Sequence, residues 1–102
     1  MSASYDEEAK RLAKLPRAER FEALLSFPAQ HVIKVIGKAQ GFSELVKKTL
    51  ADLGYPELVP IERPSAKGKF VALTVTVSVQ NGHELDRVYS ALERLPNLSY
   101  LL

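Results

Sequence analysis

The segment from position 63 to position 69 carries the densest set of groups that could bind an anion. Arg63, Lys67 and Lys69 lie within seven residues that contain no carboxylate, and Ser65 adds a hydroxyl. Gly68 permits a turn with positive φ that would bring the two lysines together. These five residues suit an acidic small molecule or an acidic protein surface. The residues alone leave open the alternative of a solvated connection between two strands.

A second candidate is the glycine-bounded segment 37–41, which we expect to be a turn between a strand and a helix. Such a turn points backbone N–H groups at an anion, so Gly37 and Lys38 are further candidates for ligand binding. The segment is similar to the phosphate loop of acylphosphatases. Those enzymes need an arginine in the first helical turn, where this sequence has Glu44 instead. We therefore expect no enzyme of this kind, and an ordinary strand-to-helix turn is the alternative.

A nucleic-acid-binding domain that uses the basic loop 63–69 is the alternative function. The sequence from Lys67 to Val71 is similar to the basic, glycine-containing stretch of RNA-recognition domains. Those domains stack bases on exposed aromatic side chains of two central strands. Phe70 is the aromatic residue of this stretch, and the first predicted strand has no Phe, Tyr or Trp. Nucleic acid is therefore not the expected partner.

The composition excludes several other classes of function. The 102 residues include no cysteine and two histidines, which argues against zinc, iron–sulfur and thiol chemistry. We expect His31 and His83 to be surface residues, and we predict no metal, no cofactor and no enzymatic activity. The net charge of +2 is too small to indicate nucleic-acid binding by itself. No apolar run is long enough to span a membrane and the N-terminus resembles no signal peptide, so we expect a cytoplasmic protein.

Hydrophobic periodicity and turn residues predict the elements that must position these groups. Residues 70–79 alternate strictly, so Val75 should face the core and Thr74 and Thr76 should face away. Ser43 is the expected N-cap of the first core helix, and Gly54 should end it. The expected strands are 31–36, 58–63, 70–79 and 98–102, and the expected helices are 16–25, 43–53 and 82–95.

This order predicts an α+β, ferredoxin-like βαββαβ domain, in which a four-stranded antiparallel sheet carries both core helices on one face. The helix-free face should be half polar, with Lys34, Thr74 and Thr76 on it. Pro60 should confine the second strand to a sheet edge. We divide the chain into an N-terminal helical extension, residues 1–28, and the ferredoxin-like domain, residues 29–102.

Several segments together resemble the small bacterial YbeD-like family. They are 24–28, 33–37, 63–70 with Thr74 and Thr76, then Leu85, Tyr89 and Leu92, and finally Pro96 with the terminal leucines. The resemblance covers residues 22–102 and departs at Ala72, where the family usually has serine. It implies a fold similar to ACT-type regulatory domains, which bind small ligands near the turn after the first strand and often pair between subunits. The family carries the label of a lipoate-pathway regulator.

We therefore predict a non-enzymatic regulatory or adaptor module that binds a small acidic ligand or a protein partner. A homodimer is compatible with the ACT-like resemblance. The expected contact residues are Arg63, Ser65, Lys67, Gly68 and Lys69, together with Gly37 and Lys38.

Overall fold

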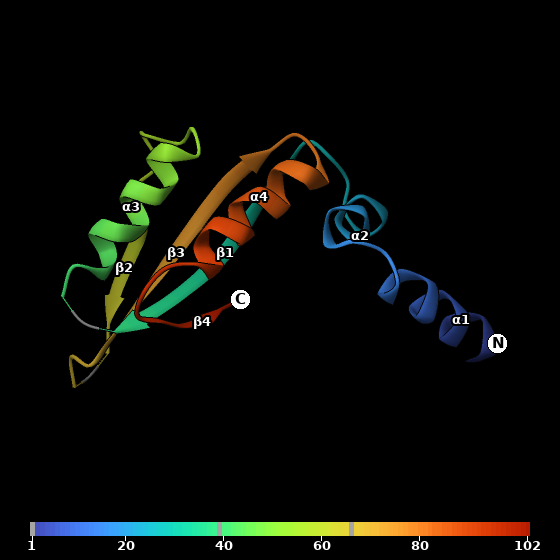
Figure 1. Ribbon diagram of the computed structural model, residues 1–102, viewed down its shortest axis with the longest axis horizontal. Coiled ribbons are helices and arrows are strands. Elements are labelled where there is room, and N and C mark those ends of the chain that lie inside the picture. Colours follow the sequence, from blue (N-terminus) through green and yellow to red (C-terminus); the bar gives the residue numbers. More distant parts are fainter. Residues whose placement is uncertain (1, 39, 66) are drawn as a thin grey trace.

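The computed structural model describes residues 2–38, 40–65 and 67–102, and it has the predicted order of core elements (Figure 1). The elements are α1 (Ser2–Ala13), α2 (Arg17–Leu24), β1 (Ala29–Lys38), α3 (Phe42–Asp52), β2 (Ile61–Pro64), β3 (Phe70–Val79), α4 (Gly82–Glu93) and β4 (Leu98–Leu101). The core is a βαββαβ unit, which confirms the predicted ferredoxin-like α+β fold.

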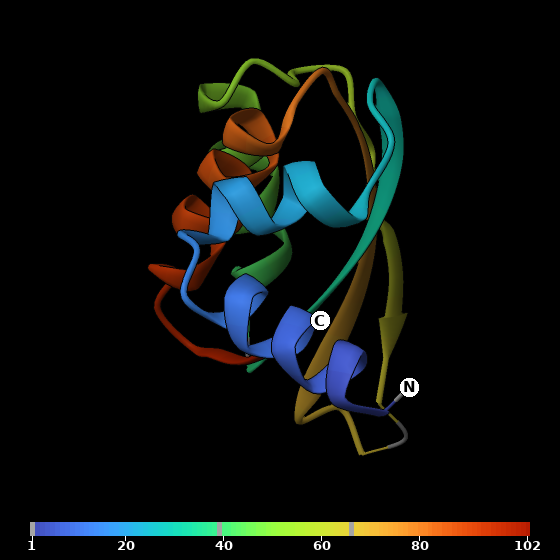
Figure 2. The same cartoon turned by 90° about the vertical axis from the view of Figure 1, so that its right-hand side faces the viewer.

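The four strands form one antiparallel sheet in the order β2-β3-β1-β4. The long strands β1 and β3 occupy the centre and pair over ten positions, from Ala29 opposite Val79 to Lys38 opposite Phe70. β2 lies at an edge, as the proline content of its segment predicts. The core helices cover one face of the sheet and leave the other without a helix (Figure 2).

The core lies between the sheet and the helices α3 and α4. β3 contributes every second residue to it, and Val75 and Val77 are fully buried there, which confirms the predicted facing of this strand. Helix α4 begins at an Asn81 cap whose side chain accepts a hydrogen bond from the backbone N–H of Glu84. The Glu84 carboxylate accepts a hydrogen bond from the backbone N–H of Gln80, the residue before the cap, so a second backbone donor is satisfied at this end.

The strand expected at 58–63 is shorter and is Ile61–Pro64, and two further predicted boundaries are wrong next to the predicted 37–41 turn. β1 continues through Gly37 to Lys38 because Gly37 pairs with Val71 on one side and Leu98 on the other. Helix α3 begins at Phe42 with Gly41, at φ +82°, in the N-cap position. Ser43 does not cap the helix, because its hydroxyl donates a hydrogen bond to the carboxylate of Glu62. Gly54 follows α3 at φ +104°, as predicted for a helix end.

The N-terminal segment contains two helices with different environments. α1 projects away from the rest of the molecule (Figure 1). α2 instead packs against α4, with Ala18 buried and Phe21 packed against the core cluster. The division of the chain at residue 28 stays a prediction. It would separate α2 from a core that α2 contacts.

Candidate functional site

The uncovered side of the sheet gathers most of the predicted contact residues. We call it the open face, and it consists of the even-numbered positions of β1 and β3, Ile61 and Arg63 of β2, and Tyr100 of β4. The pairing registers fix this set, because residues that are paired across antiparallel strands project from the same side. Side chains that lie far apart in the sequence therefore form one surface.

The charges of the open face all have the same sign. Lys34 and Lys38 project from β1 and Arg63 projects from β2, while no acidic side chain lies on the described part of this face. Glu62, the only acid of β2, is opposite the buried Leu73 and turns toward α3. The modest net charge of the chain therefore conceals a surface whose charged side chains are all basic.

A hollow of about 350 Å³ lies on this face, and its lining is mainly apolar. One row across the four strands explains it, because Arg63, Ala72, Ile36 and Tyr100 are paired in register. Ala72 is the small member of that row, so the surface is depressed between its larger neighbours. Phe70 closes one end of the hollow. The prediction of a half-polar face is confirmed, and exposed apolar side chains occupy the other half.

A second hollow, of about 260 Å³, adjoins the first. Lys34, Ile61 and Thr74 line it, and it shares Arg63 and Ala72 with the apolar hollow. Two cationic side chains and a hydroxyl thus lie beside an apolar depression. This combination suits a ligand group that carries a carboxylate next to a bulky apolar part.

The structure distributes the residues of the predicted basic loop between a strand and a hairpin. Arg63 belongs to β2, and Ser65, Lys67 and Lys69 line a hollow of about 270 Å³ beside Phe70. The backbone N–H of Phe70 donates to the Ser65 hydroxyl at 3.2 Å, so that hydroxyl helps to close the hairpin. Gly68 has φ +71°, as its predicted role in a turn requires.

Gly37 and Lys38 lie in β1, so the prediction that they belong to a turn is wrong, and their role in ligand binding stays a prediction. The side of Gly37 that would carry a side chain faces the helices, where a β-carbon would overlap the ring of Phe42. Lys38 faces the opposite way, and its Nζ lies 5.8 Å from the ring centroid of Phe70 on the open face. Lys38 therefore belongs with the other open-face cations, and Gly37 serves core packing.

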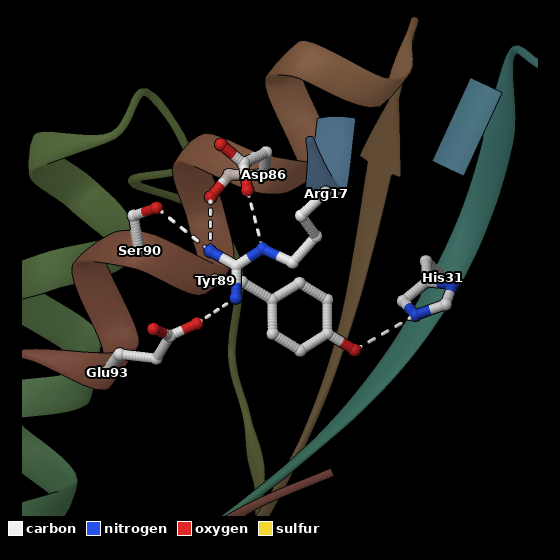
Figure 3. Close-up of polar contacts among 6 residues, drawn as sticks. All are labelled: Arg17, His31, Asp86, Tyr89, Ser90 and Glu93. Carbon is white, nitrogen blue, oxygen red and sulfur yellow. Dashed lines mark hydrogen bonds and ion pairs between the residues drawn. The ribbon is translucent and has the colours of Figure 1, made fainter. Parts of the chain in front are cut away.

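Sequence reasoning missed a polar cluster between α2 and α4 (Figure 3). The Nε of Arg17 donates to the carboxylate of Asp86 at 2.5 Å, and a second guanidinium nitrogen pairs with Glu93. The same guanidinium donates to the Ser90 hydroxyl at 3.0 Å and lies 5.6 Å from the ring centroid of Tyr89. Partial burial lowers the pKa of Arg17, but the hydrogen bonds to Glu93 and Asp86 outweigh that effect and raise it.

His31 is half-buried between the sheet and α2, so its prediction as a surface residue is wrong. Its Nε2 lies 3.1 Å from the hydroxyl of Tyr89, and the ring of Phe21 packs near both. Burial raises the pKa of Tyr89, although Arg17 acts in the opposite direction. The position of His31 could have been found from its parity, because it shares the inward side of β1 with Ile33 and Val35.

The polar cluster between α2 and α4 holds the two helices together, and its polar groups are paired with one another rather than arranged as a catalytic site. The acids Asp86 and Glu93 are engaged by Arg17, and the tyrosine and histidine engage each other. Among the described residues, no group of three or more His, Cys, Asp or Glu could hold a metal ion. No helix in the described ranges is long and apolar enough to cross a membrane.

Comparison with known proteins identifies a family model and several relatives that agree with one another. The family described as "Protein of unknown function (DUF493)" matches residues 22–102. A UPF0250 protein of Bordetella pertussis is 35% identical over 79% of this chain and 92% of its own length. One from Nitrosomonas europaea is 33% identical over 79% of this chain and 97% of its own.

A solved structure supports the fold independently. The solution structure of protein HP0495 from H. pylori aligns with a TM-score of 0.65, at 20% sequence identity, over 88% of this chain and 90% of that one. At this identity the likeness concerns the fold alone. The family match and the relatives together show that this chain belongs to the DUF493, or UPF0250, family of small bacterial proteins.

Proposed function

We propose that this chain is a non-enzymatic cytoplasmic adaptor or regulatory module whose open face binds an acidic protein partner. The observation that carries the proposal is the composition of the open face, which combines three cations with an apolar hollow and no acidic side chain in its described part. Arginine and aromatic residues around an apolar centre are typical of protein interfaces. Complementary charge on the partner would guide the encounter and favour this face.

The exposed side chains favour a protein over a nucleic acid. Val32 is 54% exposed and Ile61 is 71% exposed, and both are aliphatic, so they offer no ring for a base to stack on. The centre of the face consists of Ile36 and Ala72 rather than an aromatic pair. A second copy of this chain is disfavoured on the same surface, because two open faces would bring cations against cations.

Binding of a defined probe tests the proposal. The probe is a fluorescent peptide with glutamates on both sides of one tryptophan, and its affinity is measured by anisotropy at low and high salt. The Lys34→Ala, Lys38→Ala, Arg63→Ala triple variant should bind at least about tenfold more weakly, because it removes the three cations of the open face. The matched control replaces Lys47, Lys48 and Arg94, which are exposed on the helical side, with alanine.

The control variant has the same net charge as the open-face variant and should bind within about twofold of the wild type. Equal losses in both variants would contradict the proposal, because binding would then follow net charge alone. A labelled oligothymidylate is titrated in parallel. If it bound more tightly than the peptide and lost affinity steeply with salt, the partner would be a nucleic acid instead.

A further inference from the structure

We propose that the hollow above Ala72 is a socket for one bulky apolar side chain of the partner, and that Lys34 and Arg63 bind a carboxylate beside it. This inference rests on the proposed function and adds the chemistry that the open face recognises. It also predicts that the partner segment is extended rather than helical.

The register of the sheet explains why the socket is at Ala72. Ala72 lies between Arg63 of β2 and Ile36 of β1, and Ile36 pairs in turn with Tyr100 of β4. A methyl group among three large side chains leaves a depression that an aromatic or leucine side chain can fill. Anchors of this kind, seated in a pocket near the centre of an interface, contribute most of the affinity in many complexes.

The lining of the socket matches an apolar anchor more closely than a charged group. Ile36, Phe70, Ala72 and Tyr100 present carbon surface to it, and Arg63 contributes the main charge at its border. Tyr100 is 66% exposed and Phe70 is 38% exposed, so both have ring surface left to cover. An aromatic anchor could pack against these rings in an offset or edge-on geometry.

The adjoining hollow determines the distance between the carboxylate and the apolar anchor of the partner. It shares Arg63 and Ala72 with the socket and adds Lys34 and the Thr74 hydroxyl. Lys34 and Ile36 are two positions apart on one strand, which corresponds to about 7 Å. Side chains at positions i and i+2 of an extended peptide have that same separation. An acidic residue two positions from the anchor would therefore reach Lys34 and Arg63.

Two substitutions on the same strand test the socket. Ala72→Leu fills it from below, whereas Thr76→Leu adds similar bulk at an exposed position opposite Val32, outside the socket. Ala72→Leu should weaken binding of the tryptophan peptide by about tenfold or more, because the anchor can no longer be buried. Thr76→Leu should change it by less than about twofold. Thermal unfolding of both variants checks that each is folded.

A variant of the peptide tests the socket without any change to the protein. Replacing its tryptophan with alanine should weaken binding to the wild type by a similar factor, and Ala72→Leu should then have no further effect. Moving the nearest glutamate from two positions away to the adjacent position should also weaken binding. If Ala72→Leu and the tryptophan replacement both left binding unchanged, the socket would be wrong.

The failure of this inference can be distinguished from failure of the proposed function. If the open-face charge variant lost the peptide while Ala72→Leu and the alanine peptide did not, an acidic partner would still bind this face without a socket. If the helical-side control lost the peptide equally, both the socket and the proposed function would be contradicted.

Discussion

The ring of Phe42, the first residue of α3, lies directly against Gly37 of β1, in the space that a side chain at position 37 would occupy. Phe42 is 1% exposed, and this contact joins the helix start to the strand just before it in the sequence. Glycine is required at position 37 for this packing, although its spacing from Gly41 suggests a phosphate-binding turn.

Gly37→Ala should therefore destabilise the fold by about 1–3 kcal/mol, because the added methyl group forces the ring from a packed core. Urea unfolding measures the change. The same substitution in a Phe42→Leu background should cost less, since the smaller side chain leaves room. Additive effects of the two changes would show that Gly37 and Phe42 do not interact.

The facing of β3 predicts opposite effects for two neighbouring residues. Val75 is fully buried, so Val75→Ala should cost about 1–3 kcal/mol through lost burial and a cavity. Thr74 lies on the open face, and Thr74→Ala should cost no more than about 0.5 kcal/mol. Denaturant unfolding of both variants measures the two losses in the free energy of unfolding. A larger loss for Thr74→Ala would contradict the assigned facing.

The two N-terminal helices should differ in their importance for stability. Deleting residues 1–15 should lower the melting temperature by less than about 10 °C, because α1 projects away from the core. Arg17→Met should instead cost about 1–2 kcal/mol, since it removes the contacts with Asp86, Glu93 and Ser90. A deletion that lowered the melting temperature by more than about 10 °C would show that α1 packs on the core.

The stability of the protein should fall at alkaline pH through Tyr89. Burial raises the pKa of Tyr89 in the folded state above its ordinary value of 10.0. The unfolded chain therefore releases this proton first, so the contribution of Tyr89 to stability is constant below about pH 10 and is lost as the pH rises through the raised pKa. Tyr89→Phe should reduce that decrease, although burial also raises the pKa of Tyr55, which adds to the same loss. Identical alkaline slopes for wild type and Tyr89→Phe would contradict this role.

Much of the fold could be predicted because its signals are local. The strict alternation of residues 70–79 predicted which side chains of β3 face the core, and the helix expected from residue 82 begins where α4 begins. The glycine at position 37 misled the prediction because glycine is compatible with both a turn and a close approach. Only the position of Phe42 in space distinguishes the two.

The candidate site was predictable only in part. Arg63, Lys67 and Lys69 are close in the sequence, so their clustering is visible there. Tyr100 and Ala72 meet only through the strand order β2-β3-β1-β4, which no local pattern encodes. The Arg17 cluster depends in the same way on the packing of α2 against α4, across about 70 residues of sequence.

Amide chemical shifts during titration with the acidic tryptophan peptide test the central claim most directly. We predict saturable shifts that are largest around Ile36, Ala72 and Tyr100, with α4 near Arg17 and Tyr89 unchanged. The Ala72→Leu variant should lose these shifts, and the Thr76→Leu variant should keep them. Shifts centred on the α2–α4 side, or shifts that persist fully in Ala72→Leu, would contradict binding at the open face through this socket.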